Sequence, residues 1–208
     1  MAREDRMTTG SWRERVVEYI RVEAQPKDKF GHQPRLYALA TQVGKGMVYD
    51  DDILFAASWM HDLGVFSGHR PKDPAQLSNW DHVPYTIRRS RELLTEWGFP
   101  AAKLDGVETA IRYHQAKDEP ATVEGMLIRD ADILEQLGAI GILRAAAKVG
   151  RDSRYPNFTA IMPVLEHAVN QLANQTRLEG SKPMVQARAE MLRSFLDAVY
   201  DEAGNLLH

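Results

Sequence analysis

Apolar residues recur at helical spacing through most of this chain, and glycine or proline interrupts the pattern at intervals. A clear example follows Ser11, where Trp12, Val16 and Ile20 fall on one side of an expected helix. Ser11 and Glu14 have the spacing of a capping box, which closes the N-terminus of a helix. No segment shows a convincing strand pattern or an internal repeat, so the sequence predicts an all-α fold.

The interruptions divide the chain into a series of expected helices. We predict helices over residues 11–24, about 32–45, 53–62, 82–97 and 101–115, and two further helices within 159–203. Residues 122–149 form either one long helix or two helices joined near Gly138-Ala139-Ile140-Gly141. Residues 67–79 are polar and contain glycine and proline, so we expect a surface loop there.

The length of 208 residues suits one sizeable core. We predict a flexible N-terminal tail over residues 1–10 and a single helical domain over 11–208, whose core comprises about residues 30–150. The C-terminal helices, about 159–203, either brace this core or form a homodimer interface. Their apolar residues are Met191, Leu192, Phe195, Leu196 and Val199.

Composition excludes several classes of protein. Hydrophobic residues make up 44% and charged residues 26%, and the net charge is −3, which gives no electrostatic footprint for a nucleic acid polymer or an anionic membrane. The chain has no cysteine, so disulfides, thiolate metal sites and iron–sulfur clusters are excluded. The apolar runs are too short to span a membrane, and no apolar stretch follows the charged N-terminus. We therefore expect a cytoplasmic protein with no membrane partner.

Histidines and aspartates stand at the expected ends and buried edges of several helices. In chain order they are His32, the pair His61-Asp62, His82, His114 and Asp132. Imidazole nitrogens and carboxylate oxygens are common ligands of divalent metals. Neighbours on a regular helix point about 100° apart. The helix that carries His61-Asp62 ends before Gly64, however, and at a helix end the two side chains can converge on one ion.

This order of residues resembles the HD-domain superfamily of metal-dependent phosphohydrolases, whose pattern is His, then His-Asp, then a distant Asp. The local sequence is similar too, because Asp130-Ala131-Asp132-Ile133-Leu134 resembles the Asp-Ala-Asp-x-Leu motif of a group of small bacterial HD hydrolases. The resemblance covers about residues 30–200. It implies an HD-type helical bundle with a metal site in its core.

The resemblance also implies a ligand set, transferred position by position. The metal ligands would be His32, His61, Asp62 and Asp132. Asp130 is the alternative for the last position, and Asp132 is favoured because members of the family usually place the ligand after the alanine. Two imidazoles and two carboxylates suit Mn, Fe, Co, Ni or Zn, whereas Mg²⁺ prefers oxygen ligands alone.

A metal held by four protein ligands would keep open positions for water and for a phosphoryl oxygen. We therefore expect a hydrolase that cleaves a phosphate ester or anhydride of a small molecule, and the resemblance implies a nucleotide. Asp62 or a nearby histidine would accept the proton of the attacking water. Arg35 and Arg144 are the basic residues that we expect to contact the phosphoryl group, since arginine binds phosphate through two hydrogen bonds.

His82 and His114 leave two interpretations open. Some HD proteins hold two metal ions through two further histidines, and this chain has histidines in that order. They would bind a second ion, or contact a substrate phosphate as imidazolium. The alternative is structural, with His82 at a helix start and His114 as a hydrogen-bonded core residue. The expected cofactor is one or two divalent transition-metal ions.

Other residues near the motifs are weaker candidates. His69 follows the His-Asp pair and would contribute a cation to a phosphate site, and Trp80 would stack on a nucleobase. Some HD nucleotidases carry an acidic residue shortly after the His-Asp pair, whereas Val65 and Phe66 stand there in this chain.

Two other functions fit the same residues. HD-fold oxygenases of the inositol oxygenase type hold two irons with the ligand order His, His-Asp, His, His, Asp, and this chain can supply that order. A helical module that binds a nucleotide without turnover is the remaining alternative.

Overall fold

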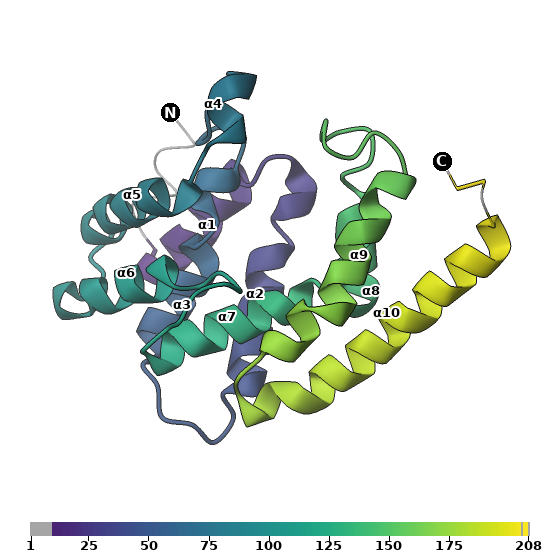
Figure 1. Ribbon diagram of the computed structural model, residues 1–208. Helices are drawn as coiled ribbons and strands as arrows, with labels where there is room; N and C mark the ends of the chain where they lie inside the picture. Colours follow the sequence, from purple (N-terminus) through teal and green to yellow (C-terminus); the bar gives the residue numbers. More distant parts are fainter. Residues whose placement is uncertain (1–9, 205, 208) are drawn as a thin grey trace. The chain divides into compact units, whose positions relative to one another are not determined.

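A computed structural model describes residues 10–204, 206 and 207 of the chain, and Figure 1 shows its ribbon. These residues form helices, turns and connecting segments, and none of them lies in a strand. The predicted all-α class is therefore confirmed. The predicted tail over residues 1–10 lies outside the described residues except for Gly10.

The chain divides into two compact units, and the boundary falls within a helix. The first unit ends at Ile128 and the second begins at Arg129. Both residues belong to α7, which spans Val123–Glu135. The prediction of one domain over residues 11–208 stays a prediction.

The first unit carries most of the residues that the sequence singles out. Its helices before α7 are α1 (Trp12–Glu23), α2 (His32–Val43), α3 (Asp51–Met60), α4 (Pro74–Ser78), α5 (His82–Glu96) and α6 (Leu104–Arg112). Short 3₁₀ turns connect some of them, namely η2 (Lys27–Lys29), η3 (Leu63–Val65) and η4 (Ala101–Lys103).

Polar residues at the helix starts explain where several helices begin. The capping box predicted for α1 is present, with Ser11 and Glu14 bonded to each other's backbone. The Asp50 side chain accepts hydrogen bonds from the Asp52 and Ile53 amides at the start of α3. Asp81 accepts one from the Val83 amide and so begins α5 at His82. Such caps satisfy the backbone N–H groups that have no partner within the helix.

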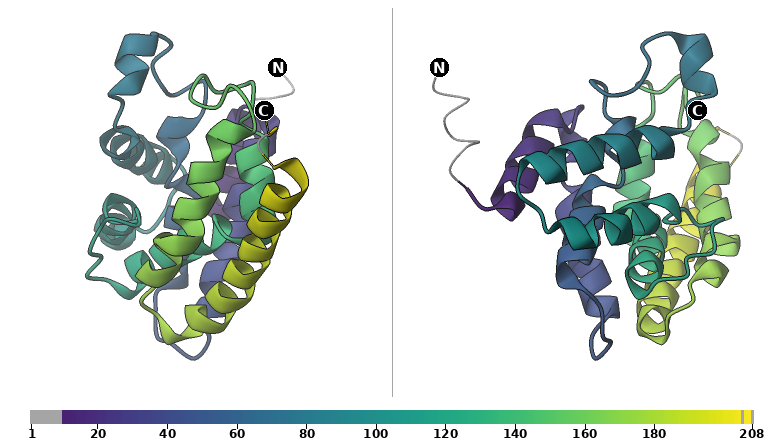
Figure 2. Two further views of the ribbon diagram at one scale, coloured as in Figure 1. Left: turned by 45° about the vertical axis from the view of Figure 1, so that its right-hand side comes forward. Right: turned by 90° about the vertical axis from the view of Figure 1, so that its left-hand side faces the viewer.

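Helix α3 is the centre of the first unit. It packs against α1, α2 and α6, and α5 packs against α6, as the two views of Figure 2 also show. Seven consecutive residues of α3, from Leu54 to Met60, are buried. A helix that is buried on nearly all sides lies within a core rather than on its surface. The last turn of α3, where the His-Asp pair stands, is therefore fixed by packing.

Two expected elements of the first unit differ from the structure. The surface loop predicted over 67–79 contains the short helix α4, because Asp73 caps the Gln76 amide and Pro74 suits the first helical position. The helix predicted over 101–115 begins with the turn η4, and its α-helical part ends at Arg112. His114 therefore lies just beyond a helix end.

The second unit consists of the end of α7 and the C-terminal helices. These are α8 (Gly138–Ala146), α9 (Met162–Asn170) and α10 (Lys182–Ala203), with the 3₁₀ turns η5 (Thr159–Ile161), η6 (Leu172–Gln175) and η7 (Glu179–Ser181). Of the two alternatives for residues 122–149, the structure has two helices. Gly138 stands at the joint with a φ of 66°, a value that glycine adopts without strain.

The second unit is held by contacts among its own helices. Helix α10 packs against α8 and α9, and α8 packs against α9. Leu192 and Leu196 are buried, whereas Met191 and Phe195 on the same helix are exposed. Leu192 and Leu196 thus brace a core, while the homodimer alternative stays a prediction for the exposed residues.

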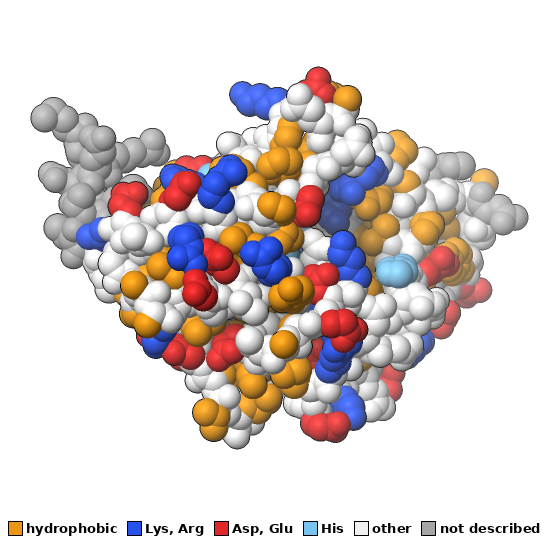
Figure 3. All heavy atoms as spheres, turned by 60° about the vertical axis from the view of Figure 1, so that its left-hand side comes forward, with side chains coloured by type: hydrophobic (Ala, Val, Ile, Leu, Met, Phe, Trp, Pro, Cys, Tyr) orange, Lys and Arg blue, Asp and Glu red, His pale blue; other side chains and the backbone are white. Residues whose placement is uncertain are grey.

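Figure 3 shows one face on which lysine and arginine side chains lie among aspartate and glutamate side chains. Within the described ranges, no helix is long and apolar enough to cross a membrane.

Candidate metal centre

The His61-Asp62 pair stands where α3 ends. His61 is the C-terminal cap of the helix, and Asp62 has already left helical geometry, with a φ of −102° and a ψ of 13°. The two side chains therefore turn toward each other, and His61 Nε2 lies 3.6 Å from Asp62 Oδ2. A regular helix would have pointed them about 100° apart.

Three more histidines of the first unit converge on the same place. His32, at the start of α2, has its Nε2 atom 3.9 Å from Asp62 Oδ2, and His82, at the start of α5, has its Nε2 atom 3.5 Å from Asp62 Oδ1. The His114 ring lies 5.0 Å from the His61 ring and 5.6 Å from the His82 ring, measured between centroids. Four imidazoles from four segments thus surround one carboxylate.

Backbone carbonyls set the tautomers of two of these histidines. The Nδ1 atom of His61 lies 3.0 Å from the Ser58 carbonyl oxygen, and that of His114 lies 2.6 Å from the Ile111 carbonyl oxygen. A carbonyl only accepts, so each Nδ1 carries the proton and donates it. When such a ring is neutral, its Nε2 atom keeps a lone pair. This arrangement is typical of histidines that bind a metal.

The histidines also fix the charge of Asp62. Burial acts to raise the pKa of this carboxyl, but His61, His32, His82 and His114 together outweigh burial and hold the pKa well below its usual range. Asp62 is therefore a carboxylate at neutral pH. The side chain is 26% exposed, so a small ligand can reach it.

Close packing around Gly64 holds the start of α5 against the His-Asp turn. A Cβ atom on Gly64 would lie 2.9 Å from the Cβ and the carbonyl oxygen of His82, closer than real contacts allow. The Gly64 amide donates to Thr86 Oγ1 over 3.0 Å, and Trp80 Nε1 donates to the Gly64 carbonyl over 2.9 Å. These contacts determine where His82 lies relative to Asp62.

Thr86 and Gly64 were not among the site residues expected from the sequence. Thr86 is fully buried and stands four residues after His82, so it shares a face of α5 with that histidine. The spacing of four residues from His82 is the feature of the sequence that could have placed Thr86 near the site. The indole N–H of Trp80 supports the turn, and its expected stacking on a nucleobase stays a prediction.

Basic residues of the first unit lie near the same turn. Lys29 donates from its ammonium to the Val65 carbonyl over 2.9 Å, three residues after Asp62. Arg35 is half-buried on α2, one turn after His32. The ring nitrogens of His69 lie within hydrogen-bond distance of Glu23 and Tyr85, and its expected contribution to a phosphate site stays a prediction.

In the second unit, Asp130 and Asp132 differ sharply. Asp130 is fully buried, and its carboxylate accepts hydrogen bonds from the Arg177 and Leu178 amides and from Ser181 Oγ, at 2.8–3.1 Å. Asp132 is half-buried, and Gln136 Nε2 donates to its Oδ2 atom over 3.3 Å. The lone pairs of Asp130 are thus committed to holding the backbone in place.

Arg144 lies on α8 in the second unit. Its guanidinium is 3.4 Å from the Glu135 carboxylate, which is buried. An arginine that neutralises a buried glutamate has a structural role to fill. Its predicted contact with a phosphoryl group stays a prediction.

The residues of the first unit fit a divalent transition metal. One ligand atom each from His61, Asp62 and His114 lies within 4.8 Å of the others. Nitrogen donors with preset tautomers, together with one carboxylate, match the preferences of Mn, Fe, Co, Ni and Zn. An exposed acidic cluster would lack the buried imidazoles, so the donor chemistry itself favours a metal.

Comparisons of sequence identified no relative. No protein-family model matches the chain, and a search of curated proteins found no match.

Comparison of structures gave clear similarities. A predicted HD superfamily hydrolase from an uncultured Thermotogales bacterium is 19% identical, with a TM-score of 0.62 over 97% of this chain and 99% of that chain. An HD-superfamily hydrolase from Bacillus thuringiensis is 19% identical, with a TM-score of 0.64 over 93% of this chain and 97% of that chain. Bacillus subtilis YpgQ in complex with ADP is 18% identical, with a TM-score of 0.66 over 93% of this chain and 99% of that chain.

These similarities show the fold. The chain has the helical fold of HD-superfamily hydrolases, as the resemblance in sequence predicts.

Proposed function

We propose that this chain is a metal-dependent phosphohydrolase that cleaves a phosphate ester or anhydride of a small molecule. One observation carries the proposal, namely the convergence of four imidazoles on the Asp62 carboxylate within the first unit. The fold supports it, because proteins described as HD superfamily hydrolases share that fold.

We propose His32, His61, Asp62 and Asp132 as the metal ligands, with His82 and His114 available to a second ion. Asp132 is included in this set because of the resemblance in sequence to HD-domain proteins. Asp130 is the weaker alternative because its oxygens are occupied by backbone amides and by Ser181. When bound, a divalent cation supplies Lewis acidity to a phosphoryl oxygen and lowers the pKa of water.

Individual side chains of the site are assigned to proton transfer and to stabilisation of the phosphoryl charge. Asp62 has a depressed pKa, so it is a weak proton acceptor and a good ligand. His82 or His114 is then the better acceptor for the proton of the attacking water. The His82 side chain is 17% exposed, which makes it the most accessible of the four imidazoles. Arg35 and Arg144 remain the proposed contacts to the developing phosphoryl charge.

Nucleotides are the substrate class that we propose. One structural neighbour, YpgQ, was crystallised with ADP, which carries both a phosphoanhydride and a phosphate ester. The test is a panel of nucleoside mono-, di- and triphosphates and other phosphorylated metabolites, assayed for phosphate or diphosphate release with Mn²⁺, Co²⁺, Ni²⁺ or Zn²⁺ after chelator treatment.

The matched control compares two histidine variants. His61→Ala should abolish release, whereas His167→Ala, at an exposed position on α9, should not. Wild-type protein that releases nothing from the panel with any of these metals would overturn the proposal. So would undiminished release by His61→Ala, because turnover would then not depend on this site.

The order of ligands favours a second candidate function, a di-iron oxygenase. His32, His61-Asp62, His82 and His114 lie together in the order that such enzymes use. Two irons per chain and oxygen consumption with an organic substrate would support the oxygenase. Turnover of a phosphate ester that is unaffected by removing oxygen would exclude it as the main activity.

A further inference from the structure

His69 is a buried histidine that the proposed metal centre does not use. It lies between η3 and α4, and its side chain is only 7% exposed. The rings of Tyr19, Phe66 and Tyr85 surround it, with centroids 5.7–6.4 Å away. A titratable side chain enclosed by aromatic rings needs a partner for each nitrogen.

Both ring nitrogens of His69 have a hydrogen-bonding partner. His69 Nε2 lies 3.0 Å from Glu23 Oε2, and Nδ1 lies 2.7 Å from the Tyr85 hydroxyl oxygen. The carboxylate accepts, so Nε2 carries a proton. Nδ1 then accepts the Tyr85 hydroxyl proton when the ring is neutral. When the ring is protonated, Nδ1 donates to the Tyr85 oxygen, and the hydroxyl proton is released for another acceptor.

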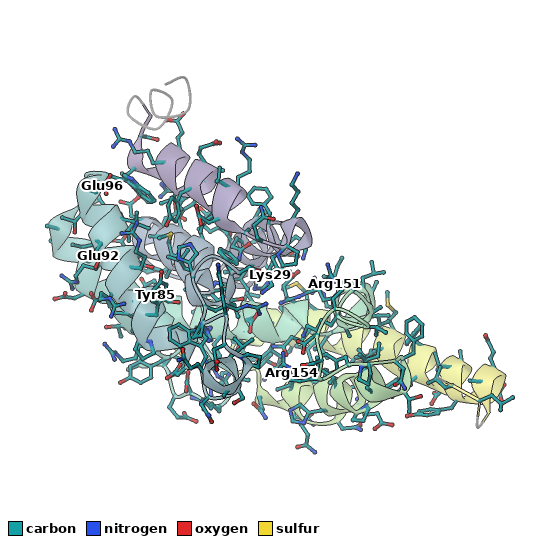
Figure 4. The ribbon with its side chains drawn as sticks, turned by 90° about the horizontal axis from the view of Figure 1, so that it is seen from above. Lys29, Tyr85, Glu92, Glu96, Arg151 and Arg154 are labelled. Atoms are coloured by element: carbon teal, nitrogen blue, oxygen red, sulfur yellow. The ribbon has the colours of Figure 1, made fainter. Side chains whose placement is uncertain are left out.

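Tyr85 stands one turn after His82 on α5, and Figure 4 shows it on this helix ahead of Glu92 and Glu96. Residues three apart share a helix face, with Cβ atoms about 5–6 Å apart. His82 is the residue whose Nε2 atom is 3.5 Å from Asp62. Tyr85 is half-buried, and its position one turn after His82 puts the two residues on one face of α5.

Tyr85 also holds its proton at neutral pH. Burial raises the pKa of this phenol, and the opposing effect of Arg89 and Arg88 is smaller. A group that stays protonated until its proton is needed suits the role of an acid.

We propose that Glu23, His69 and Tyr85 form a proton relay in which Tyr85 protonates the leaving oxygen, a role that rests on the proposed hydrolase function. Water forms a bond to phosphorus while the bond to the leaving oxygen breaks. The leaving oxygen takes the Tyr85 hydroxyl proton, and Nδ1–H of protonated His69 replaces it. The proton of the attacking water passes to His82 or His114 and from there to solvent, and His69 is reprotonated from solvent. Tyr85 is the catalytic residue, and His69 and Glu23 position it.

A purely structural role is the competing explanation. His69 connects the segment after η3 to α1 and α5, and Ser67 donates from its amide to the Gln25 carbonyl nearby. If the three residues only held this segment in place, their loss would slow every substrate by the same factor. An acid behaves differently, because a leaving group that is stable as an anion does not need a proton.

The experiment compares 4-nitrophenyl and phenyl phosphates, each as the free monoester and as the diester with thymidine. Tyr85→Phe should lower kcat/KM about 10²-fold for the phenyl compounds, whose leaving group needs a proton, and leave the 4-nitrophenyl compounds nearly unchanged. Glu23→Gln should show the same selectivity with a loss of about tenfold. Tyr19→Phe is the matched control, since its ring also contacts His69 while its hydroxyl bonds Arg89.

The outcomes separate the two levels of the proposal. Equal losses for phenyl and 4-nitrophenyl compounds in Tyr85→Phe, or no loss for either, would overturn the relay and leave the hydrolase intact. Wild-type protein without metal-dependent turnover of either probe or of the metabolite panel would overturn the hydrolase and the relay together. Thermal unfolding of each variant shows that the rates refer to folded protein.

Discussion

Asp62 and Asp130 are both carboxylates in largely buried surroundings, yet the chain holds them in opposite ways. Asp130 accepts hydrogen bonds from the Arg177 and Leu178 amides and from Ser181, and its Oδ1 atom lies 3.4 Å from the buried guanidinium of Arg129. Asp62 makes no side-chain capping bond, and its ion pairs are with the imidazoles of His32, His61 and His82.

The partners of a buried carboxylate thus distinguish a structural group from a functional one. Backbone amides neutralise a buried charge permanently and use up its lone pairs, so such a group stabilises the fold. A carboxylate surrounded by imidazoles can bind a cation, because the imidazole nitrogens can bind the same cation through their lone pairs. The two aspartates should therefore respond to substitution in opposite ways.

The largest effect is expected for Asp62→Asn. The amide keeps the shape but removes the charge that binds the cation, so metal content and turnover should fall together. A bound metal ion stabilises the transition state by several kcal/mol, so its loss should lower the rate by more than about 10³-fold. The melting temperature in chelator is measured beside the metal content, so that loss of metal is not confused with loss of fold. Metal content and kcat are the measurements, and full activity in this variant would contradict the assignment.

Gly64→Ala tests the packing that holds His82 near Asp62. The new Cβ would lie 2.9 Å from His82 atoms and 3.0 Å from Thr86 Oγ1, so the start of α5 must move. A displacement of about 1 Å at a catalytic group costs roughly 10²-fold in rate, and overpacking costs about 1–3 kcal/mol of stability. Gly46→Ala is a control for glycine loss, because a Cβ there meets no atom within 4 Å, although its φ of 84° adds local strain. Kinetics that do not change in Gly64→Ala would show that this contact does not position the site.

Asp130→Asn should give the reverse of the Asp62 result. One amide group cannot accept all the bonds that the carboxylate accepts, so its NH₂ group would face backbone donors. We expect a loss of about 2–3 kcal/mol in the free energy of unfolding, measured by urea denaturation. Metal content and turnover per folded molecule should stay at the wild-type level. Loss of metal in this variant would instead make Asp130 a ligand in place of Asp132.

A half-buried aspartate at the start of α3, Asp52, should show the smallest effect. Hydrogen bonds from Lys103 and Arg13 hold the pKa of Asp52 below its ordinary value of 3.8. Such a group stabilises the fold above the unfolded pKa, and this contribution is lost as the pH falls through the lower pKa of the folded state. Solvent screens the pair, so Asp52→Asn should cost no more than about 1 kcal/mol at pH 7. Denaturation at pH 7 and at pH 3 should show the difference shrink, whereas a difference that grows on acidification would contradict this.

Much of the fold could be predicted from sequence because its signals are local. The capping box at Ser11 and Glu14 and the N-cap at Asp50 act within one turn, and both are present. The short helix α4 escaped prediction because it covers only five residues, too few to show an apolar face.

The candidate site was predictable in part for a related reason. His32, His61, Asp62, His82 and His114 belong to residue types that suggest metal binding wherever they stand, and the structure brings them together. Thr86 and Glu23 are ordinary polar residues whose roles depend on which distant segment packs against them, namely the Gly64 turn and His69. Such pairings come from tertiary structure and leave no mark in a single sequence.

The most direct measurement is the metal content of protein purified without chelator, determined by elemental analysis for wild type, Asp62→Asn and Asp130→Asn. We expect one or two transition-metal ions per chain in wild type and in Asp130→Asn, and none in Asp62→Asn. Wild-type protein that holds no metal even after incubation with Mn²⁺, Fe²⁺, Co²⁺, Ni²⁺ or Zn²⁺, or equal content in all three proteins, would contradict this expectation.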